Sequence, residues 1–312
     1  MTKTPWKFLC TLGLTHFVTD AISGFTVTST AVGHSFLNIS LIILSYNIVA
    51  FAFQPFVGLV VDQYRFHRSA VLFGMGAMSV GLIVFTFSPI VALACIAIGS
   101  SMIHVGAGAL SSLATPKKSI GAALFTAPGV IGLTLGALAA LQSMPMIPTL
   151  LMSSVVTIAT LSRLTPKASA PMIPKIPQTP SLHSLPSILI IALLVLFVAF
   201  RSMFWLHESA TTVPMLILVF GLSAGVGKLL GGVFADRFGR VPIVNIATVF
   251  ALLCFTEGSL SMTVIGIFAL QSSTSIILST AVQRMPTYAA TISGLILGLG
   301  LAIAGIATKI IG

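Results

Sequence analysis

The chain is a succession of long apolar runs, and this pattern constrains the fold more than any other feature of the sequence. A helix needs about 20 apolar residues to cross the hydrocarbon core of a bilayer. The runs are residues 8–30, 38–61, 69–88, 91–113, 119–142, 147–162, 187–210, 213–235, 242–259, 262–284 and 288–311. We therefore predict an all-α integral membrane protein with about 11 transmembrane helices.

The composition excludes the other broad classes of protein. Of the 312 residues, 56% are hydrophobic and only 6% are charged, whereas about a quarter of the residues in a soluble domain are charged. Disorder requires low hydrophobicity and is excluded as well. The net charge of +10 would suggest nucleic acid in a soluble chain. Here the charges stand singly between apolar runs, so we predict a lipid bilayer as the surroundings and no nucleic-acid partner.

One stretch has a different composition. Residues 163–186 read RLTPKASAPMIPKIPQTPSLHSLP and contain six prolines. Such dense proline prevents a helix and favours extended structure. We therefore predict a cytoplasmic linker over 163–186, between a six-helix bundle in 1–162 and a five-helix bundle in 187–312.

The basic residues indicate the orientation. With the N-terminus in the cytoplasm, 12 of the 15 lysines and arginines fall on the cytoplasmic side. The reversed topology would place them outside, against the positive-inside rule. We predict a multi-pass protein of the cell inner (cytoplasmic) membrane with a cytoplasmic N-terminus.

A short motif occurs twice. Residues 58–62 read GLVVD and precede QYRFHR, and residues 232–236 read GVFAD and precede RFGR, 174 positions later. Both copies end an even-numbered span on the predicted cytoplasmic side. Two helical bundles repeated in parallel and joined by a long linker describe one class of secondary transporter.

The second copy carries a family resemblance. Residues 227–240, GKLLGGVFADRFGR, resemble the loop signature of the major facilitator superfamily, and the matching positions are Gly232, Asp236, Arg237, Gly239 and Arg240. The first copy is degenerate and keeps Gly58, Asp62, Arg65 and Arg68. Within the superfamily, the first half is similar to the fosmidomycin-resistance branch of drug exporters, through LTHFVTD, AFQPFVGLVVD, IGSSMIHVGAGALSS and GAALFTAPGVIGLTLG.

The resemblance implies a two-bundle transporter with a twelfth helix absent. Superfamily members have twelve helices, of which the twelfth is peripheral and the first, fourth, seventh and tenth line the central cavity. The implied partners are a small-molecule substrate and protons. Loss of a peripheral helix would favour a homodimer.

Polar residues interrupt the spans at one depth. At 1.5 Å per residue, Asp20, His104, Arg201 and the stretch 271–275 fall in one layer near the bilayer centre. A charged group there costs about 2.5–3.5 kcal/mol, so such residues are expected to pair and to face a wet cavity. The predicted substrate-cavity residues are His104, Arg201, Gln271, Ser272 and Ser275.

His16 and Asp20 lie four residues apart, on one helix face. A carboxylate beside an imidazole can hold one proton between them. We predict that Asp20, assisted by His16, is the proton-coupling site; the alternative is a structural contact between helices. For Arg201 three readings stay open, which are binding of an anionic substrate group, neutralisation of Asp20 or Glu208, and a side chain that reaches toward the membrane surface.

The repeated motif predicts a conformational latch. The two aspartates and the loop arginines would hold helix ends together through charge pairs and helix dipoles. The predicted latch residues are Asp62, Arg65, Arg68, Asp236, Arg237 and Arg240. Solvated loop charges are the alternative.

Enzyme motifs are weak in this chain. Residues 221–225 fit G-x-S-x-G but lie inside an apolar helix, whereas the motif needs a strand, a turn and a helix. His207 and Glu208 begin H-E-x-x-H, but Thr211 occupies the second histidine position. We therefore predict no enzymatic activity, no cofactor and no resident metal.

The predicted function is secondary active transport of a small solute by alternating access. The favoured form is proton-coupled export, by antiport, of a drug or an anionic metabolite. One alternative is export of a divalent metal ion, with His16, Asp20 and His104 as nitrogen and oxygen ligands. A non-transporting membrane scaffold is the alternative from a different class.

Overall fold

A computed structural model describes residues 5–32, 36–164, 185–210 and 214–311. Within these ranges the chain is helical and contains no strand. Ten helices are long and apolar enough to cross a membrane, and Ile147–Arg163 is a shorter apolar helix. These helices coincide with the segments predicted from hydropathy, so the all-α membrane fold is confirmed.

The helices follow one another with short connections in the described ranges. They are α1 (Trp6–Ala31), α2 (Phe36–Asn47), the π-helical turn η1 (Ile48–Ala52), α3 (Gln54–Tyr64), α4 (His67–Phe85), α5 (Pro89–Leu113), α6 (Ile120–Leu141), α7 (Ile147–Arg163), α9 (Leu185–Ala210), α10 (Pro214–Phe238), α11 (Arg240–Glu257), α12 (Leu260–Arg284), the 3₁₀ turn η3 (Pro286–Tyr288), α13 (Ala289–Gly294), the π-helical turn η4 (Leu295–Leu299) and α14 (Gly300–Ile311).

The predicted linker falls almost entirely outside the described residues. At its ends, Arg163 closes α7 and Leu185 begins α9. Helices α1 to α7 precede this segment, and helices α9 to α14 follow it. These two sets are called the N-half and the C-half below.

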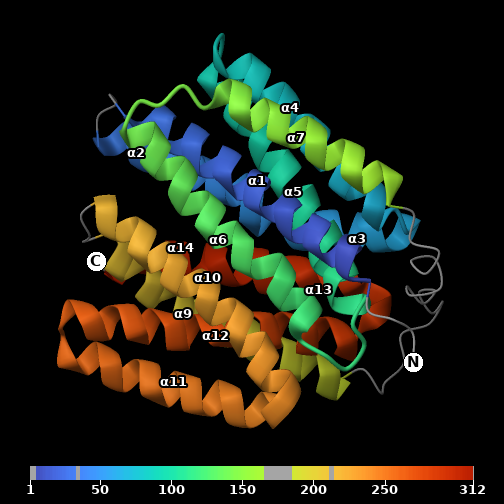
Figure 1. Cartoon of the computed structure of the whole chain (residues 1–312), viewed down its shortest axis with the longest axis vertical. Coiled ribbons are helices and arrows are strands. Elements are labelled where there is room, and N and C mark those ends of the chain that lie inside the picture. Colours follow the sequence, from blue (N-terminus) through green and yellow to red (C-terminus); the bar gives the residue numbers. More distant parts are fainter. Residues whose placement is uncertain (1–4, 33–35, 165–184, 211–213, 312) are drawn as a thin grey trace.

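Each half packs around its own helices, and a few helices join the halves. In the N-half α1 lies along α6 and α4 lies along α5, and in the C-half α12 packs between α10 and α11. Figure 1 shows α1, α4 and α7 in the upper part of the view and α11 and α12 at the bottom. The halves meet where α6 packs along α10 and where α13 packs against α3 and α5.

Close packing of α1 on α6 depends on small residues. A Cβ atom at Gly132 or Gly136 would run into the backbone carbonyl groups of Phe17 or Ala21 on α1. Glycines four residues apart let two helices approach to backbone contact. This contact fixes the depth of α1 against α6, and α1 carries two of the predicted site residues.

Burial is inverted relative to a soluble protein. Many large apolar side chains are exposed, and they include Phe56, Phe73, Phe87, Leu193 and Leu253. Many polar side chains are buried, and they include Thr15, His104, Ser111, Arg201 and Gln271. An apolar exterior of this extent fits lipid surroundings, and the buried polar groups then need partners inside the protein.

Candidate functional site

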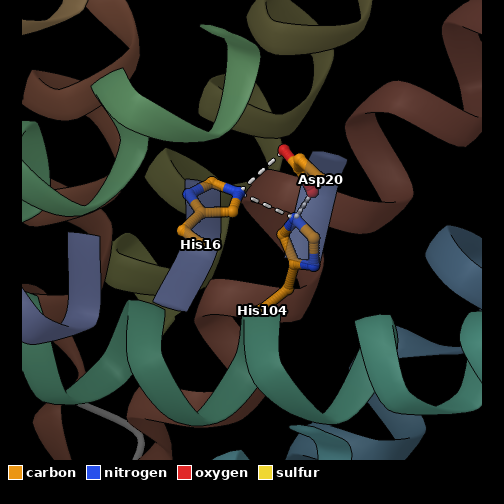
Figure 2. Close-up of side chains that lie close together, drawn as sticks. All are labelled: His16, Asp20 and His104. Carbon is orange, nitrogen blue, oxygen red and sulfur yellow. Dashed lines mark hydrogen bonds and ion pairs between the residues drawn. The ribbon is translucent and has the colours of Figure 1, made fainter. Parts of the chain in front are cut away.

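Three side chains from two helices meet in the interior of the N-half. His16 and Asp20 lie one turn apart on α1, and His104 reaches them from α5 (Figure 2). His16 Nε2 lies 3.1 Å from Asp20 Oδ2 and 3.1 Å from His104 Nε2. His104 Nε2 lies 3.7 Å from Asp20 Oδ1. These three residues form what we call the His–Asp cluster.

The other ring nitrogens determine the protonation of the cluster. His16 Nδ1 lies 2.8 Å from the carbonyl oxygen of Phe125, and His104 Nδ1 lies 2.8 Å from that of Ser100. A carbonyl oxygen can only accept, so each Nδ1 carries the hydrogen and donates it. In two neutral rings both Nε2 atoms would then present bare lone pairs to each other and to Asp20. The cluster therefore requires a cation between these atoms, which is a proton or a metal ion.

Helix α6 shapes the space around the cluster. A Cβ atom at Gly129 would lie 2.7 Å from Asp20 Oδ2 and would also meet the ring of His16. The ring of Phe125 stacks on that of His16, with centroids 4.3 Å apart and planes at 19°. The side chains of both histidines are 6% exposed and that of Asp20 is 15% exposed. The cluster is thus enclosed, with its carboxylate as the most accessible member.

A second polar group lies in the C-half. Arg201 on α9 is buried, and its Nη1 donates a hydrogen bond of 2.7 Å to Gln271 Oε1 on α12. Thr274 Oγ1 donates to the same oxygen at 3.1 Å. Among the described residues, Arg201 Nε has no hydrogen-bond partner, and Arg201 forms no ion pair with Asp20. The side chain of Glu208, the other partner considered, lies outside the described part of the chain.

Lys228 lies near these two polar groups and was not predicted as a site residue. It is half-buried on α10, and its charge acts on Asp20 and Arg201 from a distance, without an ion pair to Asp20 among the described residues. A lone lysine within a long apolar run was the available signal. The two predicted serines bond to backbone oxygens: Ser272 to Ala269 and Ser275 to Lys228, at 2.9 Å.

Asp62 joins the halves at one end of the bundle. Its carboxylate accepts hydrogen bonds from the backbone N–H of Ala290 at 3.0 Å and of Thr291 at 2.8 Å. Thr291 Oγ1 also donates to it at 2.7 Å, and His67 Nε2 lies 2.8 Å away. A carboxylate from α3 thereby caps the first turn of α13, where the helix dipole favours negative charge.

Asp236 makes the reciprocal contact. Its carboxylate accepts the backbone N–H of Ser119 at 2.6 Å and of Ile120 at 3.1 Å, at the start of α6. Asp62 of the N-half therefore caps a helix of the C-half, and Asp236 of the C-half caps a helix of the N-half. The repeated sequence motif corresponds to this repeated contact.

Arg68, in the first copy of the motif, bonds within its own half. Arg68 Nη2 donates to the carbonyl oxygens of Leu161 and Ser162, both at 2.8 Å. It thus caps the C-terminal end of α7 inside its own half, where unpaired carbonyls favour a cation. Among the described residues, the ion-pair partner of Asp62 is His67 and not Arg68. Arg65 is the left-handed C-cap of α3, with φ of 56°.

The arginines of the second motif have contacts within the C-half, and the charge of Arg240 also acts on Asp236. Arg240 donates to Thr280 Oγ1 at 3.3 Å and to Gln283 Oε1 at 2.9 Å, both on α12. The guanidinium of Arg237 lies 5.5 Å from the ring centroid of its neighbour Phe238. Arg240 therefore positions Gln283 and stays within the C-half.

Gln283 closes the same end of the bundle and was not predicted. Its Nε2 lies 3.2, 3.1 and 2.9 Å from the carbonyl oxygens of Ser112, Thr115 and Lys118 respectively. These carbonyls belong to the last turn of α5 and to the connection between α5 and α6. The ends of both halves are thus held together by two aspartates and one amide, each bonded mainly to backbone of the other half.

Two apolar grooves lie away from these polar groups. One, of about 580 Å³, lies between α3, α9 and the segment from Met285 to Leu299. The other, of about 520 Å³, lies between α1 and α7. No residue of the His–Asp cluster lines either groove.

Comparison with known proteins identifies the fold. No family model matches the sequence, and no curated protein matches it. The structure is similar to that of a major facilitator superfamily transporter, FucP, in its outward conformation, with a TM-score of 0.74, 12% identity, and coverage of 99% of this chain and 91% of that chain.

Two further solved structures agree. The human organic anion transporter MFSD10 (TETRAN) has a TM-score of 0.67, 17% identity, and coverage of 98% of this chain and 94% of its own. A variant of the fucose:proton symporter FucP of E. coli has a TM-score of 0.64, 15% identity, and coverage of 98% and 90%. The chain therefore has the multi-pass helical fold of major facilitator superfamily transporters.

Proposed function

We propose that this protein is a secondary active transporter that couples proton movement to the passage of a small solute by alternating access. The observation that carries the proposal is the convergence of two Nε2 atoms 3.1 Å apart beside a carboxylate. With both Nδ1 hydrogens donated to carbonyls, a proton between the two Nε2 atoms would satisfy both lone pairs. A buried site that holds one proton is what proton coupling requires.

Lys228 provides the link from the proton to the conformation. It belongs to α10 of the C-half, and its charge acts on Asp20 of the N-half from beyond ion-pair distance. When the proton leaves the cluster, Asp20 attracts Lys228 more strongly, because its charge is no longer balanced within the N-half. Proton binding weakens this attraction between the halves. A protonation step thereby changes the relative stability of two arrangements of the halves, as alternating access requires.

Arg201 and Gln271 are the proposed substrate contacts. A buried guanidinium whose Nε has no partner among the described residues still has a donor to offer. Its planar fork suits a carboxylate, a phosphate or a phosphonate. The nearby charge of Lys228 would favour the same ligands. We therefore favour an anionic metabolite or drug as the substrate. The likeness of the first half to the fosmidomycin-resistance exporters favours export across the cytoplasmic membrane, by proton antiport.

Asp62, Asp236 and Gln283 are the proposed latch. Their contacts join the two halves at the end of the bundle that carries the basic loops. This end must open for solute to enter from the cytoplasm. The bonds at the two aspartates would then break and re-form in each transport cycle, with water as the alternative partner for the exposed helix ends.

Reconstitution tests the proposal. The purified full chain is placed in liposomes that contain a pH-sensitive dye, and small organic anions and amphipathic drugs are added outside. We expect at least one solute to drive a change of internal pH that empty liposomes lack. If radiolabelled solutes cross without proton movement, the protein transports but is not proton-coupled. If none crosses, the proposal fails.

A further inference from the structure

The His–Asp cluster has the shape of a metal site. One ligating atom from each of His16, Asp20 and His104 can be chosen so that all lie within 4.8 Å of one another. The closest separations are 3.1, 3.1 and 3.7 Å. Two ligands at about 2.05 Å from a tetrahedral ion lie roughly 3.3 Å apart. The two imidazole nitrogens and the carboxylate oxygen nearest to each of them are spaced close to this value, although the 3.1 Å contact is to Asp20 Oδ2 and the 3.7 Å contact is to Oδ1. Figure 2 shows the three side chains directed toward one another.

The rings are also oriented as in metal-binding histidines. A ligating histidine almost always donates its second ring hydrogen to a carbonyl or a carboxylate, which fixes the tautomer and directs the lone pair at the ion. His16 does so to Phe125 O and His104 does so to Ser100 O, each at 2.8 Å. Both Nε2 lone pairs are thereby directed inward before any ion binds.

A second histidine–aspartate pair shows that proximity alone does not make such a site. His67 Nε2 lies 2.8 Å from Asp62, but that carboxylate already accepts three hydrogen bonds from Ala290 and Thr291. His67 Nδ1 has no hydrogen-bond partner among the described residues. The lone pairs of Asp62 are occupied, whereas those of the His–Asp cluster converge on one point.

The donor set selects the class of ion. Two imidazole nitrogens and one carboxylate oxygen suit Zn²⁺ and its first-row neighbours, while Mg²⁺ and Ca²⁺ prefer oxygen ligands. Three protein ligands leave a fourth position open. The side chain of Asp20 is 15% exposed, so the carboxylate side is the accessible one.

We propose that His16, Asp20 and His104 bind one first-row divalent metal ion, such as Zn²⁺, at the position that the shared proton otherwise occupies. An ion there would bridge α1 and α5 and occupy both Nε2 lone pairs. If the proposed proton coupling holds, the bound ion blocks it. Binding itself does not depend on that function, and it is measured without any transport.

Cobalt provides a spectroscopic probe. The purified full chain in detergent is titrated with Co²⁺, and the visible d–d absorption is recorded. We expect saturation at one equivalent, with the strong bands of four-coordinate Co²⁺, and loss of these bands when Zn²⁺ is added. Weak bands of six-coordinate Co²⁺ alone, or the absence of saturation, would overturn the proposal even if the protein transports protons.

Matched variants locate the ion. His104→Gln is expected to weaken Co²⁺ binding by at least about tenfold, since loss of even an outer-shell contact costs 10–100-fold. His67→Gln also removes a buried histidine beside an aspartate and is expected to leave the bands unchanged. If His104→Gln does not fold, the near-isosteric Asp20→Asn takes its place. Full bands in both cluster variants, or their loss in His67→Gln, would contradict the assignment.

Discussion

At the scale of the residue, the central feature is the pair of histidines beside an aspartate. While both imidazole rings are neutral, their Nε2 lone pairs face each other without a hydrogen between them. His16 and His104 each commit Nδ1–H to a backbone carbonyl, which leaves two lone pairs 3.1 Å apart. The spacing of His16 and Asp20 along the helix predicts their contact. The third member, His104, was predicted as a cavity residue and, in the metal-export alternative, as a ligand beside His16 and Asp20. No local pattern indicates which face of α5 turns toward α1, so its contact with them was not predictable.

Gly129 tests how closely the cluster is enclosed. In Gly129→Ala the new Cβ would lie 2.7 Å from Asp20 Oδ2, and overpacking of this kind costs about 1–3 kcal/mol. We expect a lower midpoint of thermal unfolding and impaired proton-coupled transport. Gly76→Ala on α4 is the control, because nothing lies within 4 Å of its added Cβ. Equal stability of the two variants would contradict the described packing of α6 over the cluster.

At the scale of the element, sequence reasoning located the helices but not their interruptions. The second span contains the π-helical turn η1 and the last span contains η4, and these two turns contact each other between the halves. A π turn adds one residue to a helical turn and is frequent at functional sites. Hydropathy reports only which residues are apolar. The position of such a turn depends on packing against a helix more than 200 residues away.

The helix-capping aspartates give a prediction at this scale. Asp62→Asn removes a charge that accepts hydrogen bonds from the first turn of α13, and a hydrogen bond to a charged group contributes about 1.5–3 kcal/mol. We expect this end of the bundle to open more often. Spin labels at the exposed positions Tyr64 and Arg284, with the native cysteines replaced, would then show a larger fraction of long distances.

The control for this experiment is another acidic residue near the end of a helix, Glu257 of α11. Glu257 is exposed and accepts from Ser259 close to it in sequence, so it joins no helices of different halves. Glu257→Gln should leave the distance distribution between the labels unchanged. An unchanged distribution in Asp62→Asn would show that the contact contributes little to closure.

At the scale of the whole molecule, the sequence predicts the order of elements better than the contacts between halves. The apolar runs and the repeated motif were sufficient for the fold class, because span length and loop charge are local properties. The partners of Asp62 and Asp236 were not predictable in this way. They are backbone N–H groups of Thr291 and Ser119, at sequence separations of 229 and 117 residues. Any residue type supplies such a group, so no side-chain pattern marks it.

The number of spans makes a prediction about the termini. In Figure 1, α1 and the last span, α13 to α14, run in the same direction across the bundle. An odd number of crossings places the two ends of the chain on opposite sides of the membrane. Peptide tags at residues 1 and 312 should therefore differ in protease accessibility in sealed cells, with the N-terminal tag protected. Protection of both tags would mean that the number of crossings is even.

The proposed role of Asp20 in proton coupling is tested by the variant Asp20→Asn. Its solute accumulation driven by a pH gradient is compared with its solute exchange in the absence of a gradient. The amide keeps the shape of the side chain but cannot carry the charge that balances the shared proton. Proteoliposomes containing a transported solute are assayed once with an imposed pH gradient and once for exchange of labelled against unlabelled solute at equal pH. We expect Asp20→Asn to lose accumulation driven by the gradient and to retain exchange. Gradient-driven accumulation equal to that of the unmodified protein would contradict this expectation.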